Sequence, residues 1–222
     1  MKKFLKICNH SKVKMVIILT FLFFAYTSIC AISYANDVSV DLADSVFRLH
    51  VIANSDSDVD QNLKYTVRDH LLEYMNTLCV DCTSKEEAIA LASEHIEDFK
   101  KIALDTIKKE GFDYMVNIRI GNFQFPTKHY GDISFPAGYY DALKVEIGEA
   151  KGQNWWCVMF PPLCFVDASS GIVPEESKED LENSLTDEEF SIVSDNNQDF
   201  TFTLKFKILE ILNNTGLITA KK

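Results

Sequence analysis

The sequence has few positive charges for its length, and it lacks the short motifs of several large enzyme classes. Its 22 lysines and arginines stand against 33 aspartates and glutamates, which gives a formal charge of −11. Such an acidic chain is a poor candidate for binding nucleic acid or anionic lipid headgroups. The chain contains no phosphate-binding loop, no His-Glu-x-x-His motif and no Gly-x-Ser-x-Gly motif. It also shows no internal repeat, and the length of about 185 residues that follows the leader suits one domain with a sizeable core.

Tryptophan and proline are also scarce, with two and five residues, and they are unevenly placed. Both tryptophans and two of the prolines fall in residues 151–167, together with Cys157 and Cys164. A polar turn leads into the apolar run Trp155–Phe160, which has the length of a buried strand. The Pro161–Pro162 pair ends that strand because neither residue can donate a ladder hydrogen bond. We therefore expect a rigid aromatic corner that anchors the fold.

The N-terminus has the pattern of an export signal. Lysines precede an apolar run from Met15 to about Ile32, and Ser33-Tyr34-Ala35 offers a cleavage site. The run of about 18 residues is also long enough to span a bilayer. We expect residues 1–35 to be a signal peptide or, through residues 13–32, a membrane anchor. The rest of the chain should lie outside the cytoplasm, since the positive charges precede the run. Loss of the five leader lysines brings the formal charge to about −16.

Hydrophobic periodicity predicts an α+β fold. Alternation predicts a first strand, and two apolar stripes at helical spacing predict two long helices after it. These elements cover residues 45–53, 58–78 and 84–111. Further strands are expected at 112–120, at 123–130 after a turn at Gly121-Asn122, and around 143–147. Short links between strands favour antiparallel pairing. The expected architecture is a mostly antiparallel sheet with two long helices packed on one face.

The main α+β domain is expected to occupy residues 42–168. Residues 169–199 are strongly acidic, which is typical of a solvated, flexible insertion, with one short helix where Thr186 and Glu189 form a capping box. The segment 200–218 is apolar again in its first part, so we expect it to return to the core as a strand, a helix or both.

Four cysteines remain once Cys8 and Cys30 are assigned to the leader, namely Cys79, Cys82, Cys157 and Cys164. Outside the cytoplasm these residues can form disulfides. A redox role for Cys79-x-x-Cys82 and a zinc site made by all four remain alternatives. The first motif follows a helix instead of a strand, and the second pair lacks metal-ligand spacing. We therefore expect structural disulfides and no metal.

A different interpretation makes Cys157 a nucleophile, with His50 as its base and Asp56 as the orienting carboxylate. Nothing in the sequence brings the three together, and a thiol within an apolar strand is inert unless it points into a cleft. A lone histidine such as His50 is more often a structural residue. A secreted hydrolase that depends on Cys157 or on the His50 and Asp56 pair is kept as the alternative, and we expect no catalytic residue.

Two segments carry a specific resemblance. Residues 47–56, with the sequence Phe-Arg-Leu-His-Val-Ile-Ala-Asn-Ser-Asp, and residues 147–167 resemble the stage II sporulation protein R family of endospore-forming bacteria. Val67-Arg68-Asp69 and Phe135-Pro-Ala-Gly138 add to the similarity, which covers about residues 45–168. The chain departs from the family pattern at Ala150 and Gln153, where members often carry Gly and His.

The resemblance implies an exported signalling protein that is not a known enzyme and needs no cofactor. Such a protein is made in the forespore and secreted into the space between the forespore and mother-cell membranes. There it stimulates a membrane-embedded aspartic protease that removes the pro-sequence of the mother-cell sigma factor sigma-E.

A protein that acts by contact needs a rigid exposed patch with a few anchor residues. The candidate partner-binding residues are His50, Asn54, Ser55, Asp56, Lys151, Asn154, Trp155 and Trp156. For the two tryptophans, packing in the core is the competing interpretation.

Overall fold

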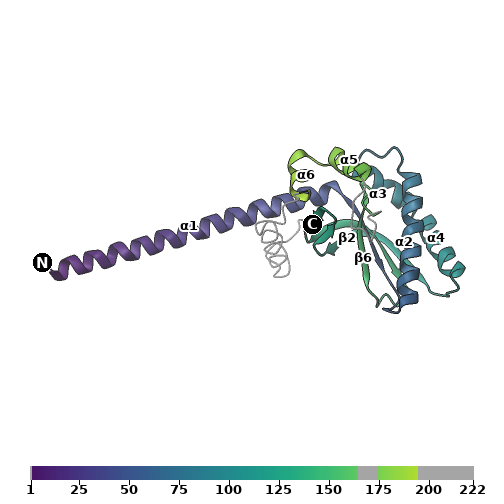
Figure 1. Ribbon diagram of the computed structural model, residues 1–222, viewed down its shortest axis with the longest axis horizontal. Coiled ribbons are helices and arrows are strands. Elements are labelled where there is room, and N and C mark those ends of the chain that lie inside the picture. Colours follow the sequence, from purple (N-terminus) through teal and green to yellow (C-terminus); the bar gives the residue numbers. More distant parts are fainter. Residues whose placement is uncertain (1, 165–174, 195–222) are drawn as a thin grey trace. The chain divides into compact units, whose positions relative to one another are not determined.

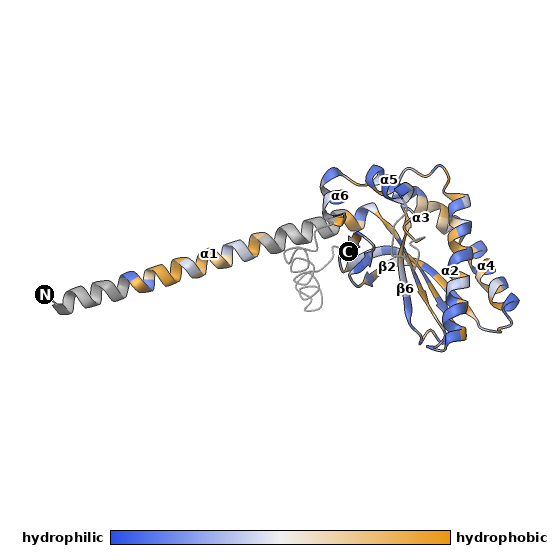
Figure 2. Ribbon diagram, in the orientation of Figure 1, coloured by the Kyte–Doolittle hydropathy of each residue, from blue (hydrophilic) through white to orange (hydrophobic). Residues whose placement is uncertain are grey.

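The structure is a computed structural model that describes residues 2–164 and 175–194. The chain divides into two units, residues 1–38 and 39–222. Helix α1 (Lys2–Ser45) begins in the first unit and ends in the second. Within the first unit, Lys12–Cys30 is long and apolar enough to cross a membrane (Figure 2). By length and composition this part of α1 suits a signal segment or an anchor, as expected.

The second unit is built on a four-stranded sheet with the order β2-β5-β1-β6. The strands are β1 (Phe47–Ile52), β2 (Val116–Phe125), β5 (Gly138–Ile147) and β6 (Asn154–Phe160). The β2–β5 and β1–β6 pairs are antiparallel, whereas the central β1–β5 pair is parallel. A separate antiparallel hairpin contains β3 (Lys128–Tyr130) and β4 (Ile133–Phe135). The expected α+β class with mostly antiparallel pairing is confirmed.

Helices α2 (Asp58–Leu78) and α4 (Ile96–Lys109) run side by side along the sheet (Figure 1). The first of the two long helices lies where the apolar stripe predicted it, and Ser57 is its N-cap. The second is divided: α3 (Lys85–Glu94) and α4 meet at His95, whose backbone dihedral angles, φ −100° and ψ 19°, leave the helical region. The Nδ1 atom of His95 is 2.9 Å from a carboxylate oxygen of Asp98.

The described part of the acidic segment is helical, with α5 (Glu175–Ser184) and α6 (Asp187–Val193). Thr186 and Glu189 form the capping box at the start of α6, as the sequence predicts. The C-terminal segment 200–218, for which we predicted a return to the core, lies outside the described residues.

The prediction of a hairpin turn at Gly121-Asn122 is wrong. Strand β2 continues through this dipeptide to Phe125 and stays paired with β5 over its whole length. Gly121 lies opposite Ala142, and Asn122 donates a side-chain hydrogen bond to Asp141 across the strands. Ten consecutive ladder positions outweigh the local turn preference of a Gly-Asn pair.

The two faces of the sheet have different surroundings. Val51 pairs with Trp155, and Trp155 contacts Tyr65 of α2, so this face is covered by helices. Because side chains alternate along a strand, His50 and its partner Trp156 lie on the opposite face. The β3–β4 hairpin covers one part of that opposite face. We call the remainder the open face; its edge strand β2 exposes Asn117 and Arg119.

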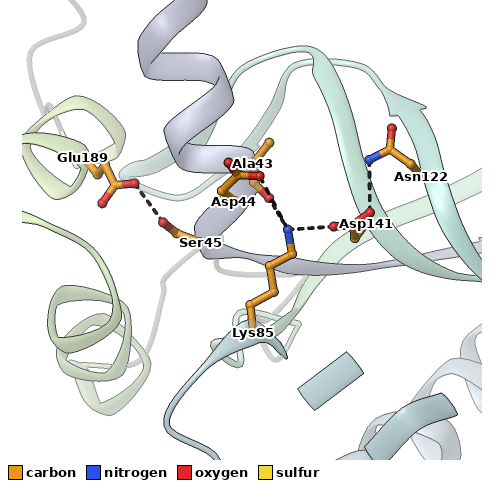
Figure 3. Close-up of polar contacts among 7 residues, drawn as sticks. All are labelled: Ala43, Asp44, Ser45, Lys85, Asn122, Asp141 and Glu189. Atoms are coloured by element: carbon orange, nitrogen blue, oxygen red, sulfur yellow. Dashed lines mark hydrogen bonds and ion pairs between the residues drawn. The ribbon is translucent and has the colours of Figure 1, made fainter. Parts of the chain in front are cut away.

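A buried lysine joins the end of α1 to the sheet (Figure 3). The side chain of Lys85 is 7% exposed, and its Nζ donates to the backbone oxygen of Ala43 at 2.9 Å and pairs with Asp141 at 2.7 Å. Burial alone would raise the pKa of Asp141, but hydrogen bonds from Lys85 and Asn122 hold it below its ordinary value. Ser45 donates to Glu189 of α6 at 2.8 Å. These contacts fix the position at which β1 begins.

Both expected disulfides are present. Cys79–Cys82 closes the turn between α2 and α3, and Cys157–Cys164 bridges the Pro161–Pro162 corner. The pairing leaves neither cysteine pair as a thiolate zinc site. In the described residues, no group of three or more histidines, cysteines, aspartates or glutamates is placed to hold a metal ion.

Candidate interaction surface

Two turns interlock at the end of the sheet where β1 finishes. We call residues 53–57 and 148–153 together the tip. Gly152 donates a backbone hydrogen bond to Ala53 at 2.9 Å, and Lys151 donates one to Asn54 at 3.2 Å. The side-chain oxygen of Asn54 accepts a further bond from the backbone of Glu149 at 2.9 Å. Turns that are joined by several backbone bonds present their outward side chains at fixed positions.

Two glycines allow the turns to approach this closely. A Cβ atom at Gly152 would collide with the backbone oxygen of Ser55. Gly148 has φ +58° and a Cβ there would collide with the side chain of Asn54. The spacing of the two turns therefore depends on the absence of side chains at both positions.

Beneath the tip lies a buried carboxylate. Asp60 is 3% exposed, and it accepts hydrogen bonds from Ser55 and from Asn54, the latter at 2.9 Å. Burial would raise the pKa of Asp60, but bonds from Ser55, Asn54 and Tyr114 bring it below its ordinary value. Asn54 and Ser55 thus direct their polar groups inward. Asp56, by contrast, is exposed at the apex of the turn.

The open face adds an aromatic pair beside the tip. The His50 ring stacks on Trp156 with ring centroids 3.6 Å apart and an interplanar angle of 15°. Its Nε2 lies 2.7 Å from the side-chain oxygen of Asn154. Trp156 is partly exposed and also contacts Phe125 edge to face at 4.7 Å. The stacking and the hydrogen bond hold the two rings in fixed positions, with His50 buried and Trp156 partly exposed.

Charged residues lie beside the His50–Trp156 pair on the open face and form a row with it across the strands. His50 pairs with Lys144, which in turn pairs with Arg119 on β2. Glu146 accepts from both cations, from Lys144 at 2.8 Å and from Arg119 at 3.3 Å. The Arg119 side chain is still 52% exposed. The row therefore passes from aromatic to cationic along the sheet.

The environment of His50 predicts a specific pH dependence. Burial of the ring lowers its pKa to about 4, with the nearby Lys144 acting in the same direction and the Asn154 hydrogen bond opposing both. The unfolded value is about 6.5, so the neutral ring stabilises the fold above about pH 6.5 and this contribution is lost as the pH falls toward 4. Thermal denaturation of the full chain in detergent should show falling stability over that interval. His50→Gln should flatten it, and an unchanged profile in that variant would contradict the assignment.

Trp155 does not join this patch. Its indole lies on the helix-covered face, 5.5 Å from the ring of Tyr65 and 4.3 Å from the guanidinium of Arg68. Lys151 is exposed at the tip and pairs with Glu149. All eight candidates lie at this end of the sheet; seven belong to the tip or to the open face, and Trp155 is separated from Trp156 by strand alternation.

Sequence inspection missed Arg48. Its side chain is fully buried under the β3–β4 hairpin, 4.2 Å from the ring centroid of Phe125 and 4.7 Å from that of Tyr140. Its Nη2 donates to the hydroxyl of Tyr130 at 2.8 Å, and that hydroxyl donates to the backbone oxygen of Trp156 at 3.0 Å. Arg48 therefore holds the hairpin against the strand that carries Trp156. The signal available in the sequence was the alternation of side chains along β1, which places Arg48 on the same face of the sheet as His50.

The hydrolase arrangement is not assembled. Cys157 is oxidised, fully buried and paired with Leu49 on the helix-covered face. His50 lies on the other face, and Asp56 is exposed at the tip. A disulfide sulfur that has no thiolate cannot act as the nucleophile. This end of the molecule presents stacked rings, amides and surface charges.

The fold and surface describe an α+β domain, preceded by an apolar helix, that presents a rigid aromatic and polar end. The family model described as Stage II sporulation protein R (spore_II_R) matches residues 43–170. The chain belongs to this family, which supports a role in sporulation. It is 43% identical over 145 residues to the Stage II sporulation protein R of Bacillus subtilis (strain 168). That similarity covers 65% of this chain and 64% of the relative. No solved structure matches the chain.

Proposed function

We propose that the chain is a secreted sporulation signal that activates a membrane-embedded aspartic protease, which then processes the pro-form of sigma-E. It acts as a non-catalytic ligand in the space between the forespore and mother-cell membranes. A ligand can activate a protease only by binding its active state more tightly than its inactive state. The tip and the His50–Trp156 pair are the surface that makes this distinction.

The observation that supports the proposal is the rigidity of the tip. Backbone bonds between the two turns and the buried Asp60 hold the tip in one conformation. Asp56 and Lys151 are exposed there, close in sequence to the inward-facing groups that fix them. A preorganised surface loses little conformational entropy when it binds, so more of its contact energy can shift the partner. Family membership and the N-terminal apolar helix agree with an exported signal.

Reconstitution tests the proposal directly. The full chain, the protease and pro-sigma-E are placed in one vesicle system, and binding and processing are measured in parallel. Asp56→Ala combined with Lys151→Ala should weaken both about tenfold, the effect of removing contacts at a binding hot spot. Asp105→Ala with Lys101→Ala removes the same charges from the exposed side of α4 and should change neither.

The two measurements separate the ligand from the hydrolase alternative. Joint loss of binding and processing supports a ligand that acts through contact. Intact binding with lost processing would instead favour chemistry by this chain over the non-catalytic proposal. Unchanged binding and processing in the tip variant would place the contact elsewhere on the molecule and overturn the assigned surface.

A further inference from the structure

A second surface feature lies away from the tip, beside the turn between α2 and α3. It is a cavity of about 700 Å³ whose inner wall contains Met75, Met159, Phe160 and Pro161, all of them buried. Its outer wall is one side of α5, which contributes Asp180 and Asn183. Its size is that of a ligand pocket, and its lining combines this apolar base with polar side chains such as Thr83 and Asn183.

A shallower hollow of about 530 Å³ continues the cavity along α2. The two share Asn76 and Val80, and the Val80 side chain is 78% exposed between them. We call the two hollows together the α2 groove. An exposed valine between two depressions is an apolar contact point that the fold itself does not use.

The charges of the α2 groove are all of one sign. Asp69, Glu73 and Asp180 are its ionisable carboxylates, and no lysine or arginine lines either hollow. Asp69 is paired with the neighbouring Arg68 at 2.6 Å. Glu73 and Asp180 form no ion pair with the described residues. The groove therefore disfavours anionic lipid or phosphate and favours a cationic occupant.

Both disulfides hold the walls of the larger cavity. Cys79 and Cys82 are themselves part of its lining. Cys157–Cys164 closes the short loop that contains Met159, Phe160 and Pro161. Methionine side chains adapt to apolar groups of different shapes, while crosslinked backbone keeps the cavity open.

We propose that the α2 groove binds a basic, amphipathic segment of a protein partner. An apolar or aromatic side chain of that segment enters the cavity and contacts Met75 and Met159. A lysine or arginine beside it contacts Glu73 or Asp180. This second contact goes beyond the activation proposed for the tip, and its test needs neither the protease nor the sigma factor.

The methionine methyl groups provide the test. The full chain in detergent is labelled at its methionine methyls, and the amide of N-acetyl-Lys-Trp-Lys is titrated while NMR spectra are recorded. The Met75 and Met159 signals should shift and saturate, whereas that of Met115, which does not line the groove, should stay in place. Failure of Met75 and Met159 to move, or equal movement of Met115, would overturn the proposal.

Two matched peptides separate charge from apolar contact. The Glu-Trp-Glu peptide should bind more weakly because it meets carboxylates, and Lys-Gly-Lys should leave the methyl signals unmoved because it has no ring. If Glu-Trp-Glu bound as tightly as Lys-Trp-Lys, the proposed basic partner would be rejected. A full response to Lys-Gly-Lys would reject the cavity as its anchor.

Variants on α5 test the site without disturbing the core. Asn183→Trp places a large ring at the mouth of the cavity and should abolish the methyl shifts, whereas Glu182→Trp on the same helix does not line it and should preserve them. Asp180→Asn should weaken binding about twofold to fivefold, as expected for one partly exposed ion pair. Glu179→Gln is its control. Equal behaviour within either pair would contradict the assignment.

Discussion

Replacing Arg48 by alanine is expected to lower the free energy of unfolding by about 3–5 kcal/mol. The side chain is fully buried, and its guanidinium lies over the rings of Phe125 and Tyr140. Truncation leaves a cavity between these rings. It also removes the donor to the hydroxyl of Tyr130, which is 8% exposed. Lost packing and the loss of one of the two partners of a buried hydroxyl both destabilise the folded chain.

The effect should be concentrated at the β3–β4 hairpin. Arg48 and the backbone oxygen of Trp156 are the two partners of the Tyr130 hydroxyl. No carboxylate neutralises Arg48 among the described residues, so the ring faces supply the electrostatic compensation for its burial. When the guanidinium is absent, the hairpin loses its hydrogen bond to β1, and the rings of Phe125 and Tyr140 lose their charged contact.

Thermal denaturation of the full chain in detergent measures the loss. The two tryptophans are adjacent, so their fluorescence reports on β6 alone. Arg48→Met keeps most of the volume and should lose less stability than Arg48→Ala. Arg119→Ala removes an exposed arginine from the same face and should change stability by less than about 0.5 kcal/mol. A loss below about 1 kcal/mol for Arg48→Ala would refute the role of Arg48 in holding the β3–β4 hairpin against β6.

Elements with regular periodicity were predictable because alternation and helical stripes are local signals. β1 lies within the alternating stretch 45–53, and α2 ends at the predicted Leu78. The break at His95 was not predictable, because apolar residues continue at helical spacing from Ala92 through Ile96 on both sides of it. Nor could local spacing show that β1 pairs in parallel with β5, since that pairing joins residues far apart in the chain.

The surface was predictable in part. The candidate residues came from the two segments that resemble the sporulation family, residues 47–56 and 147–167. The pairing of β1 with β6 places His50 opposite Trp156. The alternation of side chains along a strand is enough to predict that Trp155 and Trp156 lie on opposite faces of the sheet. The contacts of Arg48 depend on Phe125 and Tyr140, which come from two other strands and carry no local mark of that role. Interlocking of the tip likewise requires two turns that are distant in sequence.

Replacing Gly152 by alanine is expected to lower the free energy of unfolding by about 2–3 kcal/mol. The new Cβ meets the backbone oxygen of Ser55, which cannot rotate away as a side chain can. The turns must separate, which weakens the bond that Gly152 donates to Ala53. Gly111→Ala is the control for backbone conformation: it has φ +86° but open space around it, and should cost about 1 kcal/mol.

A double-mutant cycle distinguishes steric collision from general disturbance of the tip. At Gly148 the obstacle is the Asn54 side chain, so Asn54→Ala combined with Gly148→Ala should cost less than the sum of the single changes. Combined with Gly152→Ala, the same Asn54→Ala should give no such rescue, because the obstacle there is backbone. Rescue at both glycines would mean that the Asn54 side chain is the obstacle to the new Cβ atom at both positions. Rescue at neither would mean that close approach of the turns does not determine stability at this end of the sheet.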